Sequence, residues 1–325
     1  MGTGSVRGGI ISKMDTKEYR KEFSGLGLRM LVCAVIINGV QIVSQLVLLL
    51  VKPEWASDID IVLAFTMIPQ YAVGFPIAFR IMRSAGDIRT IEKHKMRPLH
   101  FLAAFPMSYT FLIAGNIIGL IVTFGIGYLK GEPVTNQLQA IVGNSNIWLT
   151  AIYTVLLAPI FEELLFRKMI CDRVVKYGQG AAVILSGLMF GLFHGNFNQF
   201  FYAYAIGSFF AFIYVKTGDI KYTIGLHMIV NFIGTVIEGL FLQRIDLEHL
   251  TLGSLFFAAL NSLLVYGIVI AGFVLILVNI SKLKVDEGEI VLAKRERNKI
   301  MLVNVGMILF YVFFVIMMIV QAIIG

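Results

Sequence analysis

Long apolar runs separated by short polar connections make up most of the 325-residue chain. A run of about 18 or more apolar residues is typical of a membrane-spanning helix. Nine runs approach or exceed this length, at residues 28–51, 59–82, 101–129, 146–166, 181–195, 199–215, 221–242, 254–280 and 300–324. The pattern therefore predicts an all-α, polytopic helical bundle of about nine transmembrane segments in the cell membrane.

Lysine and arginine are distributed regularly among the connections between these runs. They are concentrated in the N-terminal segment and in the second, fourth, sixth and eighth connections, whereas the others, such as "KPEWASDID" and "KGEPVTNQ", contain few. Because basic residues are enriched in cytoplasmic loops, the N-terminus is expected to be cytoplasmic and the C-terminus to lie on the far side. The net charge of +7 is then a sign of orientation, and no nucleic-acid partner is expected.

The composition agrees with a membrane protein. Hydrophobic residues make up 58% of the chain and charged residues 14%, whereas soluble domains carry about 25% charged residues. The two cysteines, Cys33 and Cys171, fall in or beside apolar segments, and there is no CxxC motif. Neither a disulfide framework nor a cysteine-based zinc site is expected.

Two adjacent acids stand at the end of one apolar run, in "FEELLFRKMI". Ionisable residues inside such runs are costly and usually mark function or a specific pair. Glu163 and Arg167 are four residues apart with the acid first, which favours an ion pair on a helix, and Glu162 is rotated about 100° away. We expect Arg167 to orient Glu163 and to leave Glu162 available. Alternatively, both acids extend to the cytoplasmic interface beside Arg167.

A histidine of the next run, His194 in "FGLFHGNFNQ", is expected at the depth of these acids. The middle of the turn at Gly178–Gly180 lies about 15 residues after Glu163 and about 15 before His194, or roughly 23 Å from each along a helix. An antiparallel helix pair would then place the imidazole next to the carboxylates. The alternative is a histidine that only fills a packing position.

A third polar pair follows in "GLHMIVNF", where His227 and Asn231 share one helix face. Both side chains are expected to point into the same site, although they could instead bridge two helices by hydrogen bonds. A carboxylate in a low-dielectric site can act as a general base. A histidine can bind the same water, and a second histidine and an asparagine can donate to an oxyanion. This set suits hydrolysis of an amide bond by activated water.

Three motifs occur in order over about residues 150–242: "EELLFR" (EExxxR), "FGLFH" (FxxxH) and "HMIVN" (HxxxN). Together they resemble the CAAX-protease and bacteriocin-processing (Abi) family of intramembrane endopeptidases, over less than a third of the chain. The resemblance implies a glutamate-type intramembrane protease on an all-helical bundle. The EExxxR spacing looks like the prokaryotic form, which implies processing of peptides or membrane proteins rather than of prenylated proteins.

The resemblance also implies roles for individual residues. Glu162 would activate water together with His194. His227 and Asn231 would form the oxyanion hole. The full set of implied catalytic residues is Glu162, Glu163, His194, His227 and Asn231, with Arg167 and Phe190 in support.

Two alternatives stay open. No cofactor is expected, but zinc bound by Glu162, His194 and His227 is a rival mechanism, and a non-hydrolytic membrane regulator or immunity protein is a rival function. The expected partners are a membrane-associated peptide or protein substrate and the lipid bilayer. The predicted parts are a cytoplasmic tail (1–27), N-terminal transmembrane helices (28–145), a catalytic core (146–243) and C-terminal helices (244–325) with a cytoplasmic loop (281–299).

Overall fold

The apolar runs form helices in the computed structural model, which describes residues 13–134, 144–245, 249 and 251–324. These residues contain no β-strand, so the predicted all-α class is confirmed. Within them, eight helical segments are long and apolar enough to cross a membrane: Thr16–Val51, Ile59–Arg83, Pro98–Lys130, Ile147–Tyr177, Phe197–Thr217, Ile220–Leu242, Leu252–Lys282 and Val305–Ile323.

The α-helices and the short irregular helical turns alternate along several of these segments. The α-helices are α1 (Lys13–Val51), α2 (Ile59–Pro69), α3 (Phe75–Arg83), α4 (Pro98–Lys130), α6 (Ile147–Ala151), α7 (Ala158–Glu163), α8 (Asp172–Val174), α9 (Gln179–Phe193), α10 (Phe197–Thr217), α11 (Ile220–Asn231), α12 (Glu238–Leu242), α13 (Leu252–Asn279), α14 (Lys294–Leu302) and α15 (Val305–Ile324). The π-helical segments are η2 (Gln70–Gly74), η3 (Ile152–Leu157), η4 (Leu164–Cys171) and η6 (Phe232–Ile237). Short 3₁₀ turns are η1 (Pro53–Ser57), η5 (Val175–Tyr177) and η7 (Ile280–Lys282).

The nine predicted segments become eight candidate spans within the described residues, and several ends differ from the prediction; for example, the first span begins at Thr16 and the fourth extends to Tyr177. The run at 181–195 is α9, which has 15 residues and is therefore only about 22 Å long. Most of its side chains are buried against α10, η4 and α15, so it needs no full-length apolar surface of its own. The last span begins at Val305 rather than at 300, because Asn304 Oδ1 accepts the Met307 N–H at 3.0 Å and caps a new helix.

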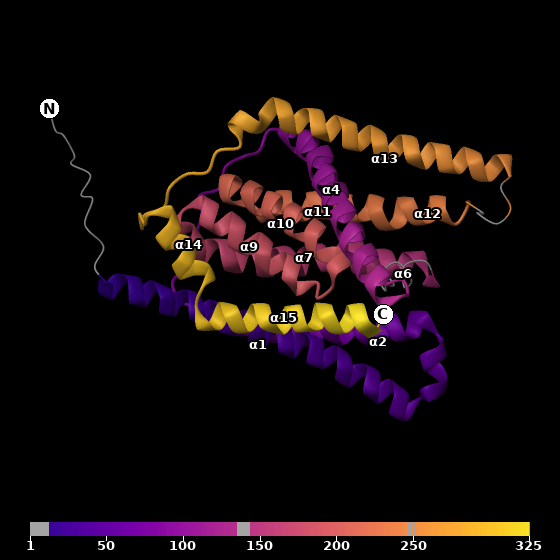
Figure 1. Cartoon of the computed structure of the whole chain (residues 1–325), viewed down its shortest axis with the longest axis horizontal. Coiled ribbons are helices and arrows are strands. Elements are labelled where there is room, and N and C mark those ends of the chain that lie inside the picture. The colour runs from indigo at the N-terminus through magenta and orange to yellow at the C-terminus, as the bar shows by residue number, and fades with distance from the viewer. Residues whose placement is uncertain (1–12, 135–143, 246–248, 250, 325) are drawn as a thin grey trace.

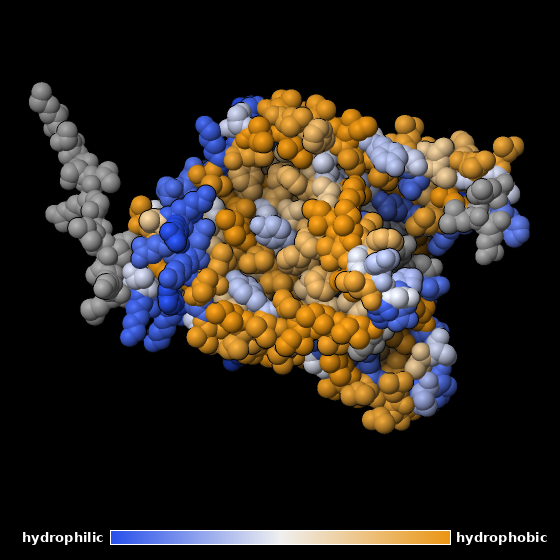
Figure 2. Space-filling model, in the orientation of Figure 1, coloured by the Kyte–Doolittle hydropathy of each residue, from blue (hydrophilic) through white to orange (hydrophobic). Residues whose placement is uncertain are grey.

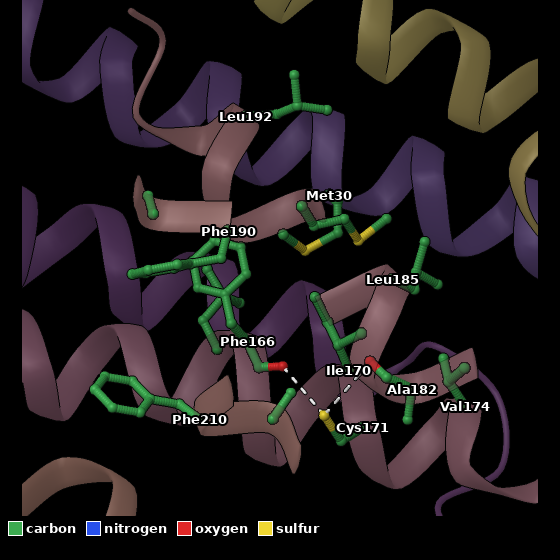
Figure 3. Packing of buried hydrophobic residues seen from close by; sticks show 14 of the residues in the cluster. Met30, Phe166, Ile170, Cys171, Val174, Ala182, Leu185, Phe190, Leu192 and Phe210 are labelled. Atoms are coloured by element: carbon green, nitrogen blue, oxygen red, sulfur yellow. Dashed lines mark hydrogen bonds between the residues drawn. The ribbon is translucent and has the colours of Figure 1, made fainter. Parts of the chain in front are cut away.

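The helices surround a central group made of α7, α9, α10 and α11 (Figure 1). In the figure, α1 and α15 run side by side along one side of this group, and α13 lies on the opposite side, with α4 crossing between. Phe166, Leu185, Met189 and Phe210 are among the fully buried side chains of the core. Figure 3 shows Phe166 of η4, Phe190 of α9 and Phe210 of α10 among the packed side chains of this core.

The outer surface is apolar over much of the molecule. Orange, hydrophobic residues cover the faces of α13 and α15 in Figure 2, and hydrophilic residues gather toward the end where α14 lies. Exposed apolar side chains are numerous on α1, α13 and α15, for example Val43, Leu263 and Ile316. A soluble protein would bury such residues. The surface therefore fits helices that contact lipid, as the predicted polytopic bundle requires.

The segment 281–299, predicted to be a cytoplasmic loop, packs against the turn before α9. The Ile290 N–H donates to the Lys176 carbonyl at 2.9 Å, and the Gln179 N–H donates to the Asp286 carbonyl at 3.0 Å. Its last residues form the start of α14. The close approach depends on glycine, since a Cβ on Gly288 would lie 2.2 Å from the Lys176 carbonyl oxygen.

Candidate active site

The first acid–base pair lies where α7 passes into η4. Arg167 Nε is 3.0 Å from Glu163 Oε2, and both side chains are fully buried. The two groups are not aligned as a hydrogen bond, so the contact is an ion pair held by proximity. The guanidinium carbon lies 4.5 Å from the ring centre of Phe190 and 5.7 Å from that of Phe210. The predicted Glu163–Arg167 pair is confirmed, with two aromatic rings completing the surroundings of the cation.

His227, on α11, contacts both acids. Its Nδ1 lies 3.0 Å from Glu163 Oε1, and its Nε2 lies 3.8 Å from Glu162 Oε2. Glu163 is thus fixed from two sides, by Arg167 and by His227. The Glu162 side chain is 22% exposed, whereas that of Glu163 is fully buried. The two adjacent carboxylates therefore differ as the sequence predicts: one is committed to partners and the other is accessible.

His194 lies at the end of α9, near the acids but not in contact with them. Its Nδ1 is 2.8 Å from the Phe190 carbonyl oxygen. A carbonyl only accepts, so Nδ1 carries the hydrogen, and in the neutral ring Nε2 has the free lone pair. Among the described side chains, His194 forms no ion pair with either glutamate. It shares the Phe190 ring with His227, at centroid distances of 4.9 and 5.9 Å.

The structure thus brings His227, rather than His194, directly onto the two carboxylates. The depth argument places His194 in the same region, but the helix ends at Phe193 and the chain turns at Gly195, whose φ of 65° is left-handed. The imidazole is therefore turned toward its own last turn. Contact between His194 and Glu162 would need a bound water or substrate between them, or a small rearrangement of this turn.

Asn231 is positioned by η3. Its Nδ2 donates to the Thr154 carbonyl at 2.7 Å, which leaves the second amide hydrogen available. The Thr235 hydroxyl donates to the main-chain carbonyl of Asn231 at 2.6 Å. The same hydroxyl lies 3.2 Å from the Thr154 hydroxyl. These contacts join η3 to the helix that carries His227, so the amide is fixed on the same face as the imidazole.

Four π-helical segments occur on the helices that build this site. Arg167 lies in η4, Thr154 lies in η3, and η6 directly follows Asn231. Tyr71, in η2, packs against Phe161, the residue before Glu162, with ring centroids 5.1 Å apart. A π turn leaves main-chain groups without their usual helical partner and is frequent at functional sites. The Thr154 carbonyl, which binds Asn231, is such a group.

Several site neighbours were not predicted from the sequence. Thr223 is fully buried one turn before His227 and lies close to Glu163. Tyr202, on α10, faces the His194 ring at a centroid distance of 6.3 Å and accepts a hydrogen bond from Gln199 Nε2 at 2.8 Å. The four-residue spacing of Thr223 to His227 could have indicated the first. No sequence signal indicates Tyr202, because its position depends on how α9 and α10 pack.

An apolar groove of about 460 Å³ opens beside the site, between η3, the α11–η6 junction and α13. It is lined only by apolar side chains, among them Val155 and Met228, which directly follow Thr154 and His227 in sequence. A segment of an apolar substrate could therefore approach the polar residues through a lipid-compatible surface.

The donor set does not gather as a metal site in this arrangement. Within the described parts of the chain, no three His, Cys, Asp or Glu side chains converge closely enough to hold a metal ion. His227 Nδ1 bonds to Glu163 and His194 Nδ1 bonds to the Phe190 carbonyl, so each ring keeps Nε2 for a possible ligand. Glu162 Oε2 and His227 Nε2 are 3.8 Å apart, but His194 does not join them. The zinc alternative would need His194 to turn toward the other two.

Comparison with known proteins finds similarity in the part of the chain that carries the three motifs. Residues 144–233, which carry all three motifs, match the family model "Type II CAAX prenyl endopeptidase Rce1-like". A protein of Bacillus subtilis (strain 168), named "Putative membrane peptidase YdiL", is 28% identical over 156 residues, 44% of this chain and 62% of the relative. The chain thus matches less than two thirds of that relative's length. No solved structure matches the chain significantly.

Proposed function

We propose, on the premise that this segment belongs to the CAAX protease family, that the protein is a membrane endopeptidase. Its substrate would be a peptide or protein associated with the membrane. The observation that carries the proposal is the pair of adjacent carboxylates with opposite environments. Glu163 is locked by Arg167 and His227, and Glu162 beside it is accessible.

In the proposed reaction, Glu162 takes a proton from a water molecule, and the hydroxide formed attacks the carbonyl carbon of the scissile bond. His194 assists by accepting a hydrogen bond at Nε2 from the hydrogen that stays on the attacking oxygen, since its Nδ1 hydrogen is bound to the Phe190 carbonyl. As the tetrahedral intermediate collapses, Glu162 gives its proton to the leaving amine nitrogen, the C–N bond breaks, and the carbonyl of the new carboxyl group re-forms. The carboxylate is then restored, and the protons balance.

The oxyanion of the intermediate would accept hydrogen bonds from Asn231 and His227. Asn231 Nδ2 has one hydrogen left after its bond to Thr154. His227 donates Nδ1–H to Glu163, and a proton on Nε2 would point toward the reaction centre near Glu162. Each such donor contributes on the order of 3 kcal/mol to transition-state stabilisation.

The test is cleavage of a fluorogenic membrane peptide by the purified full-length protein in proteoliposomes. Glu162→Gln and His194→Ala should each abolish cleavage while the thermal unfolding midpoint stays near that of wild type. Glu238→Gln is a matched control, because Glu238 also lies in a span but binds Tyr109 on α4 instead of the site. Full activity of either site variant would refute the assigned roles.

The zinc mechanism is tested in the same assay. Hydrolysis by a glutamate-activated water should survive strong chelators. Loss of activity with a chelator, and its recovery with added zinc, would decide for zinc.

A further inference from the structure

A second pocket, lined by charged and apolar residues, lies between the start of α1 and the start of α14. It has a volume of about 490 Å³. Its lining residues are Thr16, Arg20, Ala293, Arg295, Glu296, Lys299 and Ile300. The three cations and one acid give this pocket an excess of positive charge. It lies near α14, at the end of the molecule where hydrophilic residues gather beside the apolar surface of α15 (Figure 2).

The three cations of this pocket have no partner among the described side chains. Among the described residues, Arg20, Arg295 and Lys299 form no ion pair or side-chain hydrogen bond. Neighbouring cations differ: Lys176 pairs with Glu22 at 2.6 Å, and Arg297 donates to the Tyr177 carbonyl at 3.3 Å. Three long cationic side chains that surround one pocket and have no acidic partner are suited to bind an anion from outside the chain.

The start of α14 adds to this preference. The helix begins after Ala293, whose methyl side chain cannot cap it, so the first N–H groups lack a side-chain acceptor. The helix dipole also favours negative charge at this end. A phosphate in the pocket could therefore receive main-chain as well as side-chain hydrogen bonds.

The surface next to the pocket indicates where this phosphate comes from. Leu28 lies eight residues, or about 12 Å, further along α1 than Arg20, and it is the first of several exposed apolar residues on that helix. Val305 and Ile308 continue this exposed apolar surface on α15. The two helices are in close contact here, since a Cβ on Gly306 would lie 1.9 Å from the Ser24 carbonyl oxygen.

We infer that this pocket binds the phosphate headgroup of an anionic phospholipid, with its acyl chains along the exposed apolar faces of α1 and α15. A soluble phosphate would use only the polar half of this surface. The lipid contacts α1, α14 and α15 at once, so it fastens the first and last helices at their polar ends. This role is independent of peptide-bond hydrolysis.

The inference is tested by native mass spectrometry of the purified full-length protein titrated with phosphatidylglycerol. Near a membrane surface each Lys or Arg contributes about 1 kcal/mol to anionic-lipid binding, or about fivefold in affinity. The triple variant Arg20→Gln, Arg295→Gln, Lys299→Gln should therefore bind about 100-fold more weakly. The variant Arg20→Lys, Arg295→Lys keeps the charge and should stay within a few-fold of wild type.

The matched control removes the same charge elsewhere. Arg80, Arg83 and Lys284 are exposed cations outside the pocket, and their triple replacement by glutamine should change affinity by less than about fivefold. Equal losses in the two triple variants would overturn the inference, as would unchanged binding in the pocket variant. Displacement of the lipid by millimolar inorganic phosphate would also overturn it, because the site would then be one for free phosphate. Equal affinity for phosphatidylcholine would do the same.

Discussion

Replacing Arg167 by methionine removes the cation that neutralises Glu163 inside the helix bundle. The two charges are 3.0 Å apart and fully buried, and at an effective dielectric constant of about 20 they attract by about 5 kcal/mol. Contact with the Phe190 ring at 4.5 Å adds up to about 2 kcal/mol for a desolvated cation. Dehydration of both ions offsets part of this sum. We expect a loss of about 3–5 kcal/mol in the free energy of unfolding, as for other broken buried pairs.

The size of this loss should depend on which charge is left behind. The double variant Glu163→Gln, Arg167→Met leaves no unpaired carboxylate, and its glutamine can still accept the His227 Nδ1–H. It should be more stable than Arg167→Met alone. Its loss of stability should therefore be smaller than the sum of the losses of the two single variants. Arg167→Lys keeps the charge, but an ammonium cannot lie flat on Phe190, so its stability should be intermediate.

The assay is denaturant unfolding in detergent micelles, followed by far-UV circular dichroism. Peptide cleavage is measured on the same preparations. A loss below about 1 kcal/mol for Arg167→Met would refute the reasoning, because it would mean that Glu163 does not depend on this cation. A double variant that is less stable than Arg167→Met would refute it as well.

Two further predictions concern packing and positioning. Gly187→Ala should destabilise the α9–α10 contact by about 1–3 kcal/mol, because its Cβ would lie 2.0 Å from Ser208 Oγ and 2.9 Å from Ser208 N. The control Gly267→Ala has open space at its Cβ and should be neutral or stabilising. Thermal unfolding of the two variants measures the difference. Thr154→Val removes the hydroxyl contact with Thr235 but keeps the carbonyl that binds Asn231, so kcat should fall modestly and Thr154→Ser should restore it.

Local spacing predicted the parts of the site that depend on one helix. Glu163 and Arg167 form their pair because residues four apart lie on one face, and the same rule places His227 and Asn231 together. The helical type of the spans also followed from apolar run length, whereas their number did not: nine were predicted, and eight helices of the described residues are long and apolar enough. These features need no knowledge of which helix packs against which.

Features that depend on tertiary contacts could not be predicted. The bond from His227 to Glu163 depends on the relative height of α11 and α7, which the sequence pattern leaves undetermined. The His194 ring turns toward the Phe190 carbonyl because α9 ends at Phe193, the residue before it. Apolar periodicity does not locate this helix end. Asn231 binds a main-chain carbonyl released by a π turn, and no side-chain pattern marks such a group.

Charge balance explains why the two acids have different partners. With His227 neutral, Glu162, Glu163 and Arg167 together carry one net negative charge; with His227 protonated the cluster is neutral. An unbalanced charge is costly in a low-dielectric interior, so the cation is most effective beside Glu163, the acid that is fully buried. If Arg167 paired with Glu162 instead, the accessible carboxylate would be occupied, and no base would face an incoming water. Pairing Arg167 with the buried acid therefore leaves Glu162, the more exposed acid, available for the proposed reaction.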